Sequence, residues 1–128
     1  MAYCSFTSTN TSYIKDCLNT GTISSTEASS AVGGVAGLIR TYTLKGCRNT
    51  GNVIGPEGTR GLLVGSNTSS DVPSTFESCS FKGSIGAKLD GSDAVAATAD
   101  NYLSLGISFA SGVTCPSWNA DNVKFIAE

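Results

Sequence analysis

Three of the five cysteines recur along the chain at a nearly constant spacing. Cys17, Cys47 and Cys79 are separated by 30 and then 32 residues, whereas Cys4 and Cys115 stand outside that spacing. A thiolate zinc site needs ligands that converge from several directions, usually in closely spaced pairs, and the sequence contains no such pair. We therefore expect the three thiols to be small buried side chains without a metal ion. Disulfides are the alternative, either between neighbouring repeats or from Cys4 or Cys115 to a neighbour, although an odd number of cysteines fits a disulfide framework poorly.

Residues suited to acid–base chemistry are few. The chain has no histidine, which removes the usual general base, the Ser–His and Cys–His pairs and most zinc hydrolase sites. Asp90, Asp93 and Asp100 form the densest acidic region. Paired carboxylates can hydrolyse glycosides when they lie about 5 to 10 Å apart across one site, but these three acids fall in expected loops, where solvation is their ordinary state. The sequence therefore predicts no catalytic residue, no metal ligand and no cofactor.

The spaced cysteines head a segment that occurs three times. It reads CLNTGTIS at 17–24, CRNTGNVIG at 47–55 and CSFKGSIG at 79–86. Related segments at intervals of about 20 to 50 residues are typical of solenoids and propellers, in which each repeat contributes one supersecondary unit. We therefore expect a small stacked array rather than a fold with one unrepeated core.

Two further positions in this segment repeat together with the cysteines. They are the asparagines Asn19 and Asn49 and the glycines Gly21, Gly51 and Gly83. We expect the asparagines to have a structural role, bonding to the backbone of the next coil. Glycine at one repeated turn predicts backbone with a positive φ, which is cheap only for glycine. A flat hydroxyl face of the kind that binds ice is the lesser alternative, because a lysine interrupts the threonines in the third segment.

A glycine-rich segment follows each of the first two cysteine segments. Gly33 and Gly37 in the first align with Gly61 and Gly65 in the second. These glycines lie in short apolar runs with no following helix or lysine, so they predict close packing between coils rather than a phosphate-binding loop. Each repeat thus has two halves, and the spacing between them changes because the connecting surface loop changes length.

The rest of the pattern is that of short strands joined by tight turns. Apolar or β-branched runs of four to six residues are bounded by Gly, Asn, Ser or Pro, and helical periodicity is missing through residue 86. The sequence predicts an all-β chain: a short parallel β-helix, or β-solenoid, of about three coils with irregular terminal capping segments. The expected internal columns are Ile14 with Leu44 and Phe76, Ile23 with Val53 and Ile85, and Val35 with Leu63.

The repeats set the expected boundaries. Residues 1–12 are expected to form an N-terminal partial coil or cap, 13–86 the β-solenoid repeats and 87–128 a C-terminal capping segment. Within the last segment, the Ala-rich stretch 93–103 is the one helix candidate. Two terminal strands are expected after it, at 107–109 and 123–126.

The alternation of the cysteine and glycine segments resembles the GLUG-motif repeats of bacterial surface and secreted proteins. In that family a strand and turn around Cys-x-Asn-Thr-Gly alternate with a segment similar to Gly-Gly-Leu-Val-Gly. The resemblance covers residues 13–86 and implies a β-solenoid in a large extracellular protein, often from gut Bacteroidetes. It implies no catalytic residue, because the family motif is architectural. The chain departs from the motif where Phe81-Lys82 replaces Asn-Thr, where Leu62 replaces the second glycine and where no third glycine segment follows Gly86.

Composition and charge exclude some classes of partner. Only 14% of the residues are charged and the formal net charge is −2, so nucleic acid is not an expected partner. No apolar run reaches the roughly 18 residues that cross a bilayer, so we expect no membrane insertion. The Ser/Thr-rich start has no leader layout, and we expect a mature region or fragment of a longer secreted or cell-surface protein.

The function predicted from the sequence is that of a non-catalytic structural or adhesive module. An array of so few coils has two ends with unpaired strand edges, so end-to-end stacking into a homo-oligomer or filament is expected unless both ends are capped. A surface glycan or a host protein is the other expected partner. The alternative is a glycan-binding or polysaccharide-active domain, although Tyr3, Tyr13, Tyr42 and Trp118 form no evident aromatic row.

Overall fold

The computed structural model describes residues 12–69 and 74–126 of the chain. Within these ranges the chain consists of short strands and turns, with α1 (Tyr102–Gly106) as the one helix. The predicted all-β class is confirmed. The strands are short because Gly, Asn, Ser or Pro interrupts each apolar run after a few residues. The expected N-terminal segment 1–12 lies outside the described residues except for Ser12.

The strands form three successive sets, which we call the first, second and third repeats, followed by one last strand. The first repeat contains β1 (Ser12–Lys15), β2 (Leu18–Asn19), β3 (Ile23–Ser24), β4 (Val32–Gly33) and β5 (Ala36–Ile39). The second contains β6 (Tyr42–Lys45), β7 (Arg48–Asn49), β8 (Val53–Ile54), β9 (Arg60–Gly61) and β10 (Val64–Asn67). The third contains β11 (Thr75–Glu77), β12 (Cys79–Phe81), β13 (Ser84–Gly86), β14 (Val95–Ala96) and β15 (Ile107–Phe109), and the last strand is β16 (Val123–Phe125).

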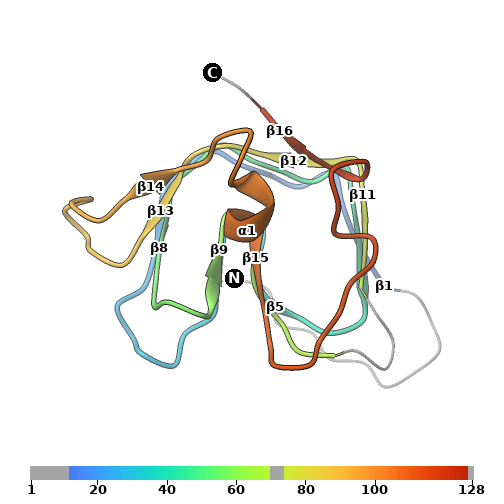
Figure 1. Cartoon of the computed structure of the whole chain (residues 1–128), viewed down its shortest axis with the longest axis horizontal. Helices are drawn as coiled ribbons and strands as arrows, with labels where there is room; N and C mark the ends of the chain where they lie inside the picture. Colours follow the sequence, from blue (N-terminus) through green and yellow to red (C-terminus); the bar gives the residue numbers. More distant parts are fainter. Residues whose placement is uncertain (1–11, 70–73, 127–128) are drawn as a thin grey trace.

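Equivalent strands of successive repeats pair with one another. The sheets have the orders β1-β6-β11, β2-β7-β12-β16, β3-β8-β13-β14, β4-β9 and β5-β10-β15. Every pairing is parallel except that of β13 with β14, which is antiparallel. In Figure 1 the strands of the different repeats overlie one another around an open outline, as β8 and β13 do. Each repeat therefore covers one edge of the repeat before it.

The register stacks inward side chains into apolar columns. Ile14, Leu44 and Phe76 occupy equivalent positions of β1, β6 and β11, and Leu44 and Phe76 are completely buried. A second column joins Ile23, Val53 and Ile85 through β3, β8 and β13. Burial of side chains of this size stabilises the fold by about 1.5–3 kcal/mol each. The columns run through all three repeats, so the core is continuous along the stack.

The Ala-rich stretch does not form the expected helix. Residues 93–103 contain β14 and turns, and α1 begins only at Tyr102. The N–H of Ala97 donates to Gly83 O at 2.8 Å, so this stretch pairs with the third repeat. Asn101 holds the following turn, because its side chain accepts from Thr98 N at 2.7 Å. Tertiary pairing has overridden the helix propensity of alanine here.

The sequence shows no third glycine segment after Gly86, but the third repeat has a strand in the equivalent position. Strand β15 pairs with β10 and places Ile107 opposite Val64, in the position that Ala36 holds in the first repeat. The segment between β13 and β15 is thus an insertion that includes α1. The last carbonyl groups of α1 accept from the second repeat, Leu105 O from Leu62 N at 2.8 Å and Gly106 O from Leu63 N at 2.9 Å. Residues 87–126 therefore extend the stack as well as cover it.

An aromatic cluster covers the outer side of the third repeat. Trp118 lies edge-on to Phe76, with ring centroids 4.8 Å apart, and parallel to Phe81 at 6.1 Å. Its Nε1–H donates to Leu103 O at 2.9 Å, which satisfies its polar atom. Tyr102, Phe109 and Phe125 complete the cluster. We call the set Tyr102, Phe109, Trp118 and Phe125 the aromatic cover.

Candidate functional site

The three regularly spaced cysteines stack in one column. The N–H that follows Cys47 donates to Cys17 O at 2.8 Å, and the N–H that follows Cys79 donates to Cys47 O at 2.9 Å. The register continues from Cys79 to Val123 of β16, which closes the column at that end. All three thiols are free; Cys47 and Cys79 are completely buried, whereas Cys17 is exposed. We call Cys17, Cys47 and Cys79 the thiol column.

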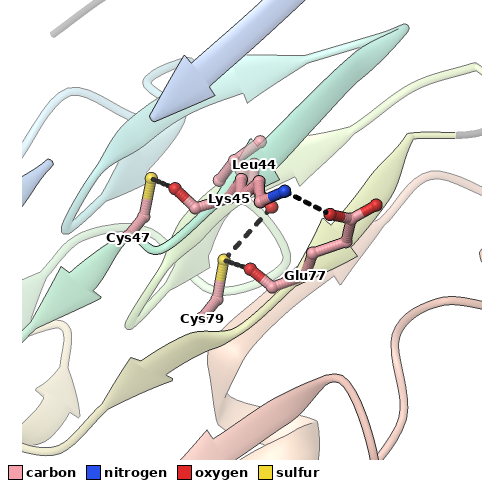
Figure 2. Close-up of polar contacts among 5 residues, drawn as sticks. All are labelled: Leu44, Lys45, Cys47, Glu77 and Cys79. Atoms are coloured by element: carbon pink, nitrogen blue, oxygen red, sulfur yellow. Dashed lines mark hydrogen bonds and ion pairs between the residues drawn. The ribbon is translucent and has the colours of Figure 1, made fainter. Parts of the chain in front are cut away.

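The sulfurs of the column have equivalent surroundings. Each thiol donates to the carbonyl oxygen two residues earlier in its own repeat, at 3.4 Å for Cys17, 3.7 Å for Cys47 and 3.6 Å for Cys79. The two buried thiols also contact the preceding repeat, Cys47 through Ile14 O at 3.2 Å and Cys79 through Leu44 O at 3.4 Å. Figure 2 shows the side chains of Cys47 and Cys79 pointing the same way. The column is therefore regular at the level of its sulfur atoms.

The column also perturbs the acidity of its own members. A hydrogen bond from Cys79 lowers the pKa of Cys47 to about 6. The same interaction, followed by burial, raises the pKa of Cys79. Partial burial, followed by the neighbouring Cys47, raises the pKa of Cys17. Cys47 is thus the thiol of the column that loses its proton first.

The two aligned asparagines bond to each other and to their own turns. Asn19 Nδ2 donates to Asn49 Oδ1 at 2.8 Å, and each Nδ2 also donates to the carbonyl of the glycine two residues later. Buried Asn49 Nδ2 donates to Leu62 O as well, at 2.6 Å. The expected bond to the backbone of the next coil is therefore replaced by a side-chain ladder. A second bond from Asn49 crosses the interior of its own repeat.

The repeated turn glycines do not share one structural requirement. Of Gly21, Gly51 and Gly83, only Gly83 has a positive φ, of 117°, so the expectation of a positive φ at all three is wrong for the first two. A Cβ at Gly51 would overlap Gly21 O of the first repeat. At Gly21 the nearest atom would be Asn19 Oδ1, at 3.9 Å. The stacking neighbour, rather than the turn itself, selects glycine at position 51.

The glycine halves pack closely, as the sequence predicts. Gly33 and Gly61 occupy equivalent positions of β4 and β9. A Cβ at Gly33 would overlap Ala36 O, and one at Gly65 would lie 2.5 Å from Gly37 O. A Cβ at Gly61 would likewise overlap Val64 O. Gly33, Gly61 and Gly65 therefore serve contact between chain segments, which leaves no open cradle for a phosphate at these three positions.

The acidic residues build a loop. Asp93 accepts from Ala87 N at 2.8 Å and from Lys88 N at 2.9 Å, and Asp90 accepts from Ser92 N at 2.9 Å. These backbone hydrogen bonds lower the pKa of both carboxyl groups. The structure thus uses both aspartates to close the turn between β13 and β14, while Asp100 lies exposed in a later turn.

A surface hollow beside the third repeat is lined by hydrogen-bonding side chains and one lysine. It has a volume of about 460 Å³ and is lined by Asn52, Lys82, Ser84, Thr98 and Phe125 together with small residues. None of the described residues that line it is acidic. The aromatic residues considered for a glycan surface are dispersed: Tyr42 is buried, Trp118 belongs to the aromatic cover and Tyr13 lies exposed beneath Lys15 Nζ. Tyr3 lies outside the described residues.

Within residues 12–69 and 74–126, the outer edge of the first repeat is the open end of the stack. Among the described residues, β1 to β5 each pair on one side only, with the second repeat. Ile14 and Ile23 are partly exposed there, whereas Leu44 and Val53 in the same columns are 0% exposed. At the other end of the stack, the aromatic cover packs over Phe76, whose side chain is 0% exposed. We call the outer edges of β1 to β5 the first-repeat edge. The sequence predicts that a short array has unpaired edges at its ends, but not which residues form them.

The centre of this edge has a backbone group that points outward. Cys17 O and Asn19 O both accept from the second repeat, at 2.8 and 2.9 Å. Because successive residues of a strand direct their polar groups to opposite sides, Leu18 between them directs its N–H and C=O outward. The side chain of Leu18 is 63% exposed and that of Tyr13 54%. Such an edge can accept another strand by backbone pairing.

Comparisons with known proteins supply no family for this chain. No protein-family model matches the sequence, and neither a curated protein nor a solved structure matches it. Within the described ranges, no group of three or more His, Cys, Asp or Glu side chains is arranged to hold a metal ion. The same part of the chain contains no helix of the length and hydropathy that a membrane span requires.

Proposed function

We propose that the chain is a non-catalytic β-solenoid module of an extracellular bacterial surface protein, with a structural or adhesive role, and that it associates end to end through its first-repeat edge. The observation that carries the proposal is the one-sided exposure of the columns. Ile14 and Ile23 are partly exposed, whereas Leu44 and Val53 behind them are fully buried. Covering the open end would complete the burial that the second repeat already has.

Several features support the β-solenoid and its location. The parallel ladders join residues about one repeat apart, as in the register of Ile14 with Leu44, and a solenoid requires such pairing. The resemblance of residues 13–86 to GLUG-motif repeats supports a bacterial surface protein. The small charged fraction, 14%, supports an outer face of hydroxyl and amide groups that meets other surfaces by hydrogen bonding and shape.

The two ends of the stack are not equivalent, and this determines the expected assembly. The aromatic cover and β16 lie over the third repeat, so in the part of the chain that the structure describes the first-repeat edge is the end that remains for contact. Two such edges facing each other form a closed, two-fold pair, because each copy contributes the same surface. An open filament would need the cover of the next copy to move aside.

Sedimentation velocity over a concentration series tests the association. The informative variant is Leu18→Pro, since proline removes an N–H that points outward and not one that bonds to the second repeat. The matched control is Leu18→Ala, which keeps the N–H and removes most of the exposed side chain. Both variants are first compared with the parent chain by thermal unfolding.

The parent chain and Leu18→Ala are expected to form pairs as concentration rises, and Leu18→Pro is expected to remain monomeric with an unchanged unfolding temperature. A parent chain that stays monomeric at every concentration would contradict end-to-end association. Pairing that persists in Leu18→Pro would show that the contact lies elsewhere on the surface. Filaments in the parent chain would show that the covered end also takes part.

A further inference from the structure

The thiol column places sulfur atoms at the spacing of neighbouring strands. Each thiol faces the carbonyl oxygen two residues before it, at 3.4 to 3.7 Å, and the next repeat reproduces this arrangement. Neighbouring strands in a sheet lie about 4.7–4.9 Å apart. Equivalent atoms on equivalent strands are separated by the same translation. The sulfurs of Cys17, Cys47 and Cys79 therefore follow one another at that interval along the stack.

This interval is too long for a disulfide and suits one bridging ion. A disulfide holds its sulfurs about 2.05 Å apart and its Cβ atoms about 3.8 Å apart, whereas in-register Cβ atoms stay close to the strand spacing. Two metal–thiolate bonds of about 2.3 Å in a straight line span about 4.6 Å. The column can thus accept an ion between two sulfurs without moving its strands.

We propose that Cys17 and Cys47 form a binding site for a soft, two-coordinate d10 cation of the Cu(I) or Ag(I) class, held in a line between their sulfur atoms. Thiolates favour soft ions of this class. A tetrahedral ion would need more ligands than the two sulfurs supply, and no group of three or more suitable side chains among the described residues is arranged to hold one. Closely spaced cysteine pairs, which tetrahedral zinc requires, are not needed for two-coordinate binding.

Of the two neighbouring pairs in the thiol column, only Cys17 and Cys47 can be reached by an ion from solvent. Cys17 is exposed at the open end of the stack, and Cys47 behind it is buried. An ion can therefore reach the space between them from solvent, whereas both members of the Cys47–Cys79 pair are completely buried. Asp16, next to Cys17, adds a negative charge that disfavours a bare thiolate there and favours a bound cation.

Binding exchanges protons for the ion without any redox change. Two metal–sulfur bonds form, and each coordinating thiol that is still protonated releases its proton to solvent. Cys17 gives up the hydrogen bond from its thiol to Lys15 O, and Cys47 gives up those to Ile14 O and Lys45 O. Cys79 keeps its proton and its bond to Leu44 O.

Native mass spectrometry with Ag(I) tests the site in a Cys4→Ser/Cys115→Ser background, which removes the other two cysteines. The background protein is expected to bind one Ag(I) tightly. Cys17→Ser is expected to weaken binding by about 100-fold or more, because the second ligand no longer acts within one site. Cys79→Ser is the matched control and is expected to bind Ag(I) as the background protein does.

Absorption spectroscopy at the silver edge gives a second readout that does not depend on variants. Two sulfur neighbours around the bound Ag(I) are the expected result, and a single sulfur neighbour would overturn the proposal. Unchanged affinity in Cys17→Ser would also overturn it. Loss of binding in Cys79→Ser together with full binding in Cys17→Ser would place the ion in the buried pair and would equally contradict the site proposed.

Discussion

Asn49 is the side chain that joins the most parts of the repeat. It is 0% exposed, accepts from Asn19 Nδ2 at 2.8 Å and Gly51 N at 3.1 Å, and donates to Gly51 O and Leu62 O. Its amide therefore fixes the turn after β7 and ties that turn to the chain that follows β9. A buried polar group is stable in this position because every one of its hydrogen-bonding directions is used.

Replacing this side chain tests that account. Asn49→Ala leaves buried backbone groups at Gly51 and Leu62 without partners, so we expect the free energy of unfolding to fall by about 2–4 kcal/mol. The matched variant Asn19→Ala removes the same side chain at the more exposed end of the ladder, and a loss of about 1 kcal/mol or less is expected. Urea unfolding measures both. Equal losses would show that burial of the ladder does not govern its contribution.

The buried thiols give stability a pH dependence of known sign. The pKa of Cys79 is raised above its ordinary 9.0, so the folded chain holds this proton at pH values where the unfolded chain releases it. Stability from this group is complete below pH 9.0 and declines as the pH rises further. Cys47, with its pKa lowered to about 6 in the folded chain and 9.0 as its ordinary value, adds a slope of the opposite sign up to and around pH 9. It is ionised in both states, and adds no slope, only well above pH 9.

We therefore expect the free energy of unfolding to fall more steeply above pH 9 in the parent chain than in a Cys47→Ala/Cys79→Ala variant. The difference in slope is at most about 1.4 kcal/mol per pH unit for one proton. Urea unfolding at several pH values above 9 measures both proteins. Both carry Cys17→Ser, because partial burial and then Cys47 raise the pKa of Cys17, and the contribution of Cys47 would not cancel. Parallel pH profiles would contradict a raised pKa at Cys79.

At the scale of the elements, the turns are selected by the repeats on either side of them. Gly51 sits where a Cβ would overlap Gly21 O of the preceding repeat, but Gly21 itself has an open outer side. Glycine at this turn is thus required by close backbone contact in the second repeat but not in the first. A glycine in the first repeat is tolerant because its outer neighbour is missing from the described stack.

This difference predicts opposite outcomes for one substitution. Gly51→Ala forces the first and second repeats apart and is expected to lower the free energy of unfolding by about 2–3 kcal/mol or more. Gly21→Ala is expected to change it by no more than about 0.5 kcal/mol, as for ordinary surface substitutions. Thermal or urea unfolding of the two variants compares them. A large loss in Gly21→Ala would indicate that this turn has a close neighbour after all.

The sequence could predict the repeated elements and the two terminal strands, which are expected at 107–109 and 123–126 and are present as β15 (Ile107–Phe109) and β16 (Val123–Phe125). It could not predict the fold of the insertion between β13 and β15. The alignment of Ile14 with Leu44 and Phe76 follows from spacing alone, and the strand register confirms it, because Leu44 pairs with both residues. The segment after β13 has no second copy with which to align it. Alanine content therefore suggested a helix at 93–103, although pairing of Ala97 with Gly83 prevails there. The arrival of β15 beside β10 depends on contacts across the insertion, which no local pattern records.

For the candidate sites the same limit applies. Spacing identified the thiol column and the asparagine ladder, because both repeat with the period. Spacing could not predict that Cys17 is exposed whereas Cys47 is buried, because that depends on which repeat lies at the end of the stack. The outward direction of the Leu18 N–H likewise needs the hydrogen bonds of its two neighbours.

At the scale of the whole molecule, the stack of repeats has two different ends. Repeats add along a single axis; among the described residues, the aromatic cover and β16 lie at one end and the first-repeat edge lies at the other. Association through the open edge and ion binding at the exposed end of the thiol column both follow from this polarity. The central claim is therefore that equivalent residues of successive repeats pair in parallel.

Through-hydrogen-bond couplings in the NMR spectrum of the labelled chain test that claim most directly. The account predicts couplings from Arg48 N–H to the carbonyl carbon of Cys17 and from Ser80 N–H to that of Cys47, since these bonds join neighbouring repeats at 2.8 and 2.9 Å. Couplings that instead link adjacent strands of one repeat as antiparallel hairpins would contradict the stack, and with it both proposals.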